Sequence, residues 1–261
     1  MNVFIITDLE GISGIEHMSQ VSDTTADTYR FSLERLMADT NAAIAGAFDS
    51  GASAVFVEDG HGGGANFIDG MLDPRAVQVK NMSPEYLDMT KIDLCMSVGA
   101  HAMSGTQNAF LDHTQSSVAW HDYSINGRSC GELAQSAAFV GSYGIPMVMV
   151  SGDEAACAEA KQFLGDIAVA VVKYAVGRNT AKVVDIAVAE RRIYEAAKAG
   201  MELGGKIKPF CPLLPAEIKL EYNRADYCDS AIERANNTER LDARTVRKVI
   251  CEIKEFTDLL I

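Results

Sequence analysis

The sequence predicts an α/β fold, with a mostly parallel central sheet flanked by helices and a smaller C-terminal α+β unit. Three observations support this prediction. Short apolar runs alternate with helical segments up to about residue 178, many of these runs are rich in β-branched residues, and the pattern changes beyond that point. We therefore expect a first α/β domain at residues 1–178 and a smaller α+β domain at residues 179–261.

The first three elements form a β–α–β unit. Residues 2–7 (NVFIIT) are typical of a buried strand, and residues 53–58 (SAVFVE) of a second one. Residues 23–50 between them place apolar side chains at helical spacing, and Gly51 is suited to end that helix. This order predicts two parallel strands joined by a right-handed crossover.

The alternation continues through the rest of the first domain. Asn126-Gly127 predicts a two-residue hairpin turn. The remaining expected strands are 76–79, 93–98, 146–150 and 167–172, and the expected helices are 84–89, 131–143 and 153–164.

The second domain is expected to begin with a long helix at residues 180–203. A proline-rich turn region follows, then a strand at 217–222, and the chain from 244 to 260 is expected to be mostly helical.

Composition excludes several classes of function. The chain has 261 residues, 48% of them apolar, and a formal net charge of −13 without a basic cluster, so the electrostatic signature of a nucleic-acid-binding protein is missing. The sequence contains no apolar run of the roughly 20 residues that a membrane span needs. Its start does not resemble a signal peptide, and the six cysteines form no C-x-x-C pair. We expect a cytoplasmic protein whose acidity suits a cation-binding site.

Asp8 and Glu10 directly follow the first strand, where α/β sheets place their ligand sites. Residues two apart on an extended segment point the same way, so both carboxylates would face one spot. A bound dication would offset their mutual repulsion. The same pair could instead cap the turn that follows.

Asp59 and His61 follow the second strand, and His101 follows a third. Polar residues at three strand ends on one sheet edge favour a shared site. Imidazole and carboxylate ligands without thiolates are typical of a catalytic zinc or manganese centre. Each histidine by itself could also be structural.

Four further residues have side chains that could take part in such a site. His113 lies in a polar loop and could be a general acid or base, or a surface residue. Glu132 opens a helix, where the helix dipole already favours a carboxylate. We interpret His121 as a packing residue, and His17 has no partner in the sequence.

Together these segments resemble the D-aminopeptidase family of dizinc peptidases. The resemblance rests on D-x-E-G-I-S-G at 8–14, Asp-Gly-His at 59–61, Gly-Ala-His at 99–101, His113, INGRSCGEL at 125–133 and PMVMVSGDE at 146–154. This sequence departs from the family pattern around its first ligand histidine, where Glu58-Asp59-Gly60-His61 replaces the family's commoner Asn-Asp-Ser-His. It differs again at Asp112-His113-Thr114, where the family has a Ser-His-Ser type of context.

The resemblance implies an aminopeptidase that acts on short peptides with a free N-terminus, often a D-residue, and assembles into ring-shaped homo-oligomers. It implies two zinc ions per chain, although manganese or another divalent ion would fit the same ligands. Its implied site is Asp8 as the bridging ligand, Glu10 and His61 on one metal, His101 and Glu132 on the other, and His113 as the catalytic residue. Two alternatives stay open: another dimetal amidase or hydrolase, and a non-catalytic, metal-stabilised binding protein.

Overall fold

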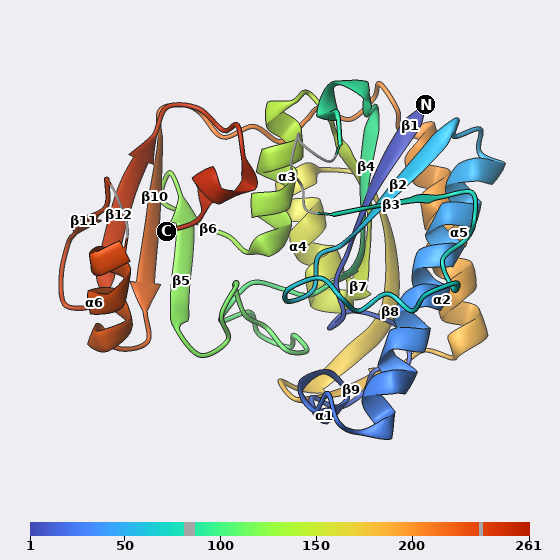
Figure 1. Cartoon of the computed structure of the whole chain (residues 1–261), viewed down its shortest axis with the longest axis horizontal. Helices are drawn as coiled ribbons and strands as arrows, with labels where there is room; N and C mark the ends of the chain where they lie inside the picture. Colours follow the sequence, from blue (N-terminus) through green and yellow to red (C-terminus); the bar gives the residue numbers. More distant parts are fainter. Residues whose placement is uncertain (81–86, 235–236) are drawn as a thin grey trace.

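The structure is a computed structural model that describes residues 1–80, 87–234 and 237–261. Its two sheets, of seven and five strands, lie at opposite ends of the molecule with helix α3 (Glu132–Ser142) between them (Figure 1). This arrangement confirms the predicted class, a mostly parallel sheet flanked by helices with a smaller α+β unit.

The seven-stranded sheet has the order β3-β2-β1-β4-β7-β8-β9. Its strands are parallel except for β9, which runs antiparallel to β8. The strands are β1 (Asn2–Thr7), β2 (Ala54–Asp59), β3 (Val77–Val79), β4 (Leu94–Ala100), β7 (Met147–Asp153), β8 (Ala168–Gly177) and β9 (Thr180–Val183).

Helices cover both faces of this sheet (Figure 1). Successive side chains of β1 point to opposite faces, as the strand geometry requires. Val3 and Ile5 join a core with residues of α2 and α5, whereas Phe4 and Ile6 join a core with residues of α3. The helices of this region are α1 (Ser19–Ser22), α2 (Asp27–Asp49), α3, α4 (Glu154–Leu164) and α5 (Ile186–Glu202), with the 3-10 turn η1 (Met89–Lys91).

The five-stranded sheet is antiparallel, with the order β11-β12-β10-β5-β6. Its elements are β5 (Trp120–Ile125), β6 (Arg128–Ser129), β10 (Ala216–Tyr222), α6 (Ala225–Arg234), β11 (Glu239–Arg240), β12 (Thr245–Ile250) and the 3-10 turn η2 (Phe256–Leu259). Asn126 and Gly127 both have positive φ and join β5 to β6, which confirms the predicted hairpin turn. Strands β5 and β6 precede residue 178 but pair in the sheet formed by later strands. The domain boundary at residue 178 stays a prediction.

Two expected helices are wrong in part. Residues 244–260 were expected to be mostly helical, but Thr245–Ile250 forms strand β12, which pairs with β10 and β11. The β-branched residues of this TVRKVI segment favour a strand, and β10 pairs with it along its whole length. The helix expected at 180–203 begins at Ile186, because Thr180–Val183 pairs with β8 and Asp185 caps the helix. The helix expected at 84–89 falls largely outside the described residues.

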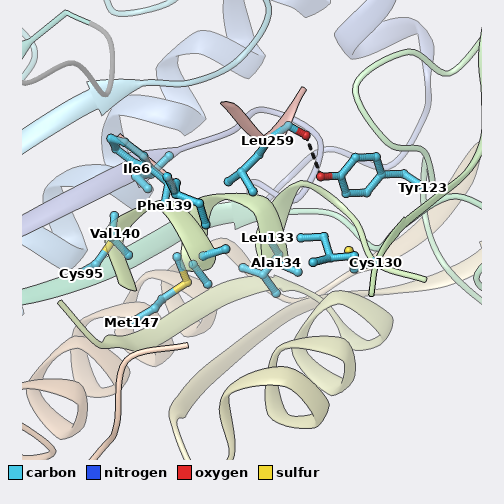
Figure 2. Packing of buried hydrophobic residues seen from close by; sticks show 14 of the residues in the cluster. Ile6, Cys95, Tyr123, Cys130, Leu133, Ala134, Phe139, Val140, Met147 and Leu259 are labelled. Atoms are coloured by element: carbon cyan, nitrogen blue, oxygen red, sulfur yellow. Dashed lines mark hydrogen bonds between the residues drawn. The ribbon is translucent and has the colours of Figure 1, made fainter. Parts of the chain in front are cut away.

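The C-terminal segment packs back onto α3. The Tyr123 hydroxyl donates a hydrogen bond to the Leu259 carbonyl at 2.7 Å (Figure 2). The ring of Phe256 meets that of Phe139 of α3 edge to face, with centroids 6.2 Å apart. The small sheet and the tail therefore share one core with α3. Each helix of the described chain is too short or too polar to cross a lipid bilayer.

Candidate metal centre

Three neighbouring strands of the large sheet deliver the predicted ligands to one edge. Asp8 follows β1, His61 lies two residues beyond β2, and His101 follows β4. Since the order is β2-β1-β4 and all three strands are parallel, Asp8 lies between the two histidines. The sheet topology therefore explains why this carboxylate faces both imidazoles.

The first group of donor atoms consists of Asp8, Glu10 and His61, and these atoms lie within 4.8 Å of one another. His61 Nδ1 is 3.0 Å from Asp8 Oδ1 and 3.0 Å from Glu10 Oε2. The contact with Asp8 has the geometry of a hydrogen bond, whereas Glu10 Oε2 is buried without a hydrogen-bond donor. A buried carboxylate oxygen without a donor is costly, and a cation between these atoms would remove that cost.

The second group consists of His101, His113 and Glu132, again within 4.8 Å. Glu132 Oε1 is 3.3 Å from His101 Nε2 and 3.7 Å from His113 Nε2. The two imidazole rings stack with centroids 4.0 Å apart. Glu132 is the first residue of α3, and its Oε1 also accepts a 2.6 Å hydrogen bond from the Gln115 backbone. The structure thus brings together all six residues that the sequence predicted for the site.

Asp8 connects the two groups. Its Oδ1 faces His61, and its Oδ2 lies 3.3 Å from His101 Nε2. A carboxylate whose two oxygens face two different donor sets can bridge two cations.

Backbone carbonyls orient two of the histidines. His101 Nδ1 lies 3.0 Å from the Ala102 carbonyl, and His113 Nδ1 lies 2.8 Å from the Leu111 carbonyl. A carbonyl only accepts, so both rings must carry their proton on Nδ1. This leaves Nε2 of each ring directed at Glu132, which is the arrangement that metal-ligating histidines usually show.

Crowding of carboxylates changes the proton affinity of the ring nitrogens. Burial alone would lower the pKa of His61, but the Asp8 hydrogen bond and the charge of the nearby Glu10 carboxylate outweigh it and raise the pKa to about 11. Burial is likewise outweighed at His101, where Glu132 and Asp8 hold the pKa well above its usual value. At Glu10 burial favours the neutral acid, yet the two histidines lower the pKa below its usual range. The cluster therefore attracts positive charge strongly, and its oxygen and nitrogen donors fit zinc or manganese.

Glycines allow the ligand-bearing loops to touch. The Gly11 amide donates a 2.8 Å hydrogen bond to the Gly99 carbonyl, and a Cβ at Gly11 would overlap the Ala100 carbonyl oxygen. Gly99 has a φ of +85°, and a Cβ there would overlap the Asp8 carbonyl oxygen. The glycines of the D-x-E-G and Gly-Ala-His motifs are thus required by the close approach of two backbones.

A buried lysine that was not predicted from the sequence supports the loop after β1. Lys173 is fully buried, and its ammonium donates a 2.7 Å hydrogen bond to the Glu10 carbonyl. Burial lowers its pKa to about 7, against the opposing charges of Asp39 and Asp153. The signal was a single lysine inside the apolar run of β8, where a charged side chain needs buried partners.

Three other candidates lie outside the donor sets. Asp59 accepts hydrogen bonds from the backbone and side chain of Asn66, so it closes the glycine-rich loop that carries His61. His17 contacts the Ser19 hydroxyl. His121 is exposed on β5, so the interpretation of this histidine as a packing residue is wrong.

The centre opens into a cavity of about 610 Å³. Asp8, His101 and Glu132 line it together with the glycine-rich loop after β2. The rest of the lining, which includes Gln115, Ser136 and residues 255–257, was not predicted from the sequence. These residues come from a loop, a helix and the C-terminal segment, whose meeting no local pattern reveals.

Paired carboxylate and imidazole donor sets at a sheet edge, opening into a cavity, define a metal-dependent hydrolase. The model of the D-aminopeptidase family (Peptidase_M55) matches residues 1–260, and the chain belongs to this family of metallo-aminopeptidases. A D-aminopeptidase of Bacillus subtilis (strain 168) is 27% identical over 274 residues, covering 99% of this chain and 97% of the relative. The structure of the Zn-dependent D-aminopeptidase DppA from Bacillus subtilis, described as a self-compartmentalizing protease, superposes with a TM-score of 0.92. That match has 25% identity and covers 100% of this chain and 95% of the other.

Proposed function

We propose that this chain removes N-terminal D-amino acids from short peptides and uses two zinc ions to do so. The observation that carries the proposal is the position of Asp8, whose Oδ1 and Oδ2 face His61 and His101 separately. Family membership and the zinc dependence of the similar Bacillus enzyme support the reaction and the metal.

Each ion would be held by carboxylate and imidazole side chains. Asp8 is the bridging ligand, Glu10 and His61 complete one metal site, and His101 and Glu132 complete the other. Three carboxylates against two dications leave a net positive centre. Two such ions supply Lewis-acid polarisation of the peptide carbonyl and lower the pKa of a water molecule.

His113 is assigned the catalytic role. The Leu111 carbonyl holds its Nδ1 proton, so Nε2, which lies 3.7 Å from Glu132 Oε1, can accept or donate a proton, or attack. The same nitrogen could instead be a third donor to the second metal, because it shares that group with His101 and Glu132. The two roles predict different losses in His113→Ala: a catalytic residue would cost activity alone, whereas a ligand would also cost a metal ion.

The test measures zinc per chain and the release of D- and L-amino acids from matched dipeptides. We expect two zinc ions per chain and faster release from the D-peptide. His113→Ala should keep both ions and lose hydrolysis by about 10²-fold or more, whereas loss of one ion would make His113 a ligand. His121→Ala, at an exposed histidine, is the matched control. Metal-free wild-type protein would contradict the metal centre, and equal rates on both enantiomers would contradict the D-preference.

We also propose a ring-shaped homo-oligomer. The similar Bacillus enzyme is described as self-compartmentalizing, and the two folds match over the whole of this chain. Light scattering after size-exclusion chromatography should give a mass several times that of the 28.1 kDa chain. A monomer at micromolar concentration would contradict this proposal.

A further inference from the structure

The C-terminal segment forms one wall of the cavity above the metal centre. Glu255, Phe256 and Thr257 line the same space as Asp8 and Glu132, although they lie in a different part of the sequence. In Figure 1 the red turn that contains η2 lies between α3 and the small sheet.

This wall is firmly attached to α3 and β5. Beyond the Tyr123–Leu259 hydrogen bond and the Phe256–Phe139 contact, the Tyr143 hydroxyl donates to the Lys254 carbonyl at 2.8 Å. The Glu255 side chain and the Asp258 side chain each accept a hydrogen bond from the other's backbone amide, which is a capping box. The wall is therefore held in place from both ends of the turn.

The glycine-rich part of the cavity lining offers little to select a substrate side chain. It is formed by Gly62, Gly63 and Gly64, and a Cβ placed on Gly62 or Gly63 would meet no atom within 4 Å. Any discrimination between substrate side chains must therefore come from the other residues of the lining, which include Glu255, Phe256 and Thr257.

The charged residues along the cavity are almost all acidic. The described lining contains five carboxylates and one histidine, but neither lysine nor arginine; the carboxylates are Asp8, Glu58, Asp59, Glu132 and Glu255. Asp8 and Glu132 belong to the metal centre, and Asp59 is engaged by Asn66. Glu255 is the member of this set that is exposed, so its charge is presented to a molecule that enters.

We infer that the Glu255–Thr257 wall selects substrates by charge, because the Glu255 carboxylate disfavours acidic peptide side chains relative to neutral and basic ones. This inference rests on the proposed function, since it specifies which short peptides the same cavity accepts. Repulsion by an exposed carboxylate corresponds to a factor of up to about fivefold in selectivity.

The test compares three dipeptides, D-Glu-Ala, D-Ala-Ala and D-Lys-Ala, on the zinc-loaded wild type and on Glu255→Gln. Glutamine retains a side-chain oxygen that can accept the Asp258 amide, so the turn should keep its cap. We expect the ratio of kcat/KM for D-Lys-Ala over D-Glu-Ala to fall about fivefold in the variant, with D-Ala-Ala as the uncharged reference and zinc content unchanged. Glu252→Gln, at an exposed carboxylate that pairs with Lys254 outside the cavity, is the matched control.

A ratio that stays constant in Glu255→Gln, or that falls equally in Glu252→Gln, overturns the inference while leaving the peptidase intact. Calorimetric binding of free D-Glu and D-Lys gives a readout that needs no turnover. If that binding selectivity shifts in Glu255→Gln but no peptide is hydrolysed, the wall is supported and the proposed function fails instead.

Discussion

The two sheets of this molecule contribute to the site in different ways. The seven-stranded sheet carries Asp8, His61 and His101 just beyond the ends of β1, β2 and β4, with Asp8 between the two histidines. The five-stranded sheet carries none of the proposed ligands, but it holds the tail that lines the cavity. The difference indicates that parallel strands position the chemistry, whereas the antiparallel sheet shapes the space in which a substrate lies.

The largest effect is expected from a carboxylate of the centre. Asp8→Asn keeps the shape of the side chain but removes the charge that both donor groups share. Zinc should be lost, and activity should fall by more than the roughly 10- to 100-fold cost of changing an outer-shell partner. Zinc analysis and kcat/KM measure this change. The counterpart in the small sheet is Glu221→Gln. Loss of the surface ion pair between Glu221 and Arg244 should leave zinc content and kcat/KM unchanged.

A second comparison sets two glycines against each other. Gly11→Ala forces a Cβ into the Ala100 carbonyl, so we expect about 3 kcal/mol or more of lost stability together with weaker zinc binding. Gly127 in the small-sheet hairpin has a positive φ and open space around it, so Gly127→Asn should cost less than about 1 kcal/mol. Urea denaturation measures the loss of unfolding free energy in each variant. Similar losses in both would show that the backbone contact at Gly11 is unimportant.

A third effect depends on pH. Glu159 of α4 is buried, and burial raises its pKa to about 7 from an ordinary value of 4.5. Between these values the folded chain binds more protons than the unfolded chain, so this group makes stability fall as pH rises from about 4.5 to 7. Glu159→Gln should remove that decline, worth up to about 3 kcal/mol.

The measurement for Glu159 is the urea midpoint of wild type and variant at intervals from pH 5 to pH 8. The gap between the two curves should widen in favour of the variant as pH rises. Glu239→Gln, on the exposed face of the small sheet, should give a curve parallel to the wild type. A constant gap for Glu159→Gln would mean that the buried carboxylate is ionised throughout this range.

The smallest effect concerns the attachment of the tail. Tyr123→Phe leaves the Leu259 carbonyl without its buried donor, which should cost about 1 to 2 kcal/mol while zinc content is kept. Tyr174→Phe, at an exposed tyrosine of β8, is the control. Differential scanning calorimetry of both variants measures the change, and equal melting temperatures would argue against the tail as a stabilising element.

The large sheet could be predicted because its information is local. Each strand is one apolar run followed directly by a polar residue, and parallel order brings those residues to one edge. Asp8, Glu10, His61 and His101 were found by this reasoning. Glu132 and His113 depended on the family resemblance, since a helix start and a polar loop have many ordinary explanations.

The small sheet was harder because its pairings are distant in sequence. Strand β12 pairs with β10, and β10 pairs with β5, nearly a hundred residues earlier. Thr245–Ile250 was expected to be helical because its partners were unknown, although its β-branched residues favoured a strand. Lys173 and the 255–257 wall were missed for the same physical reason, because only the folded chain places them beside the centre.

The contact between Gly11 and Gly99 also has a consequence for motion. The Asp8 amide bonds the Val98 carbonyl and the Gly11 amide bonds the Gly99 carbonyl, so the segments that carry Asp8 and His101 can separate only if both bonds open. Exchange of the Gly11 amide proton with solvent therefore reports how often the two donor groups part. The exchange rate of this single backbone proton can thus measure how often the whole centre opens.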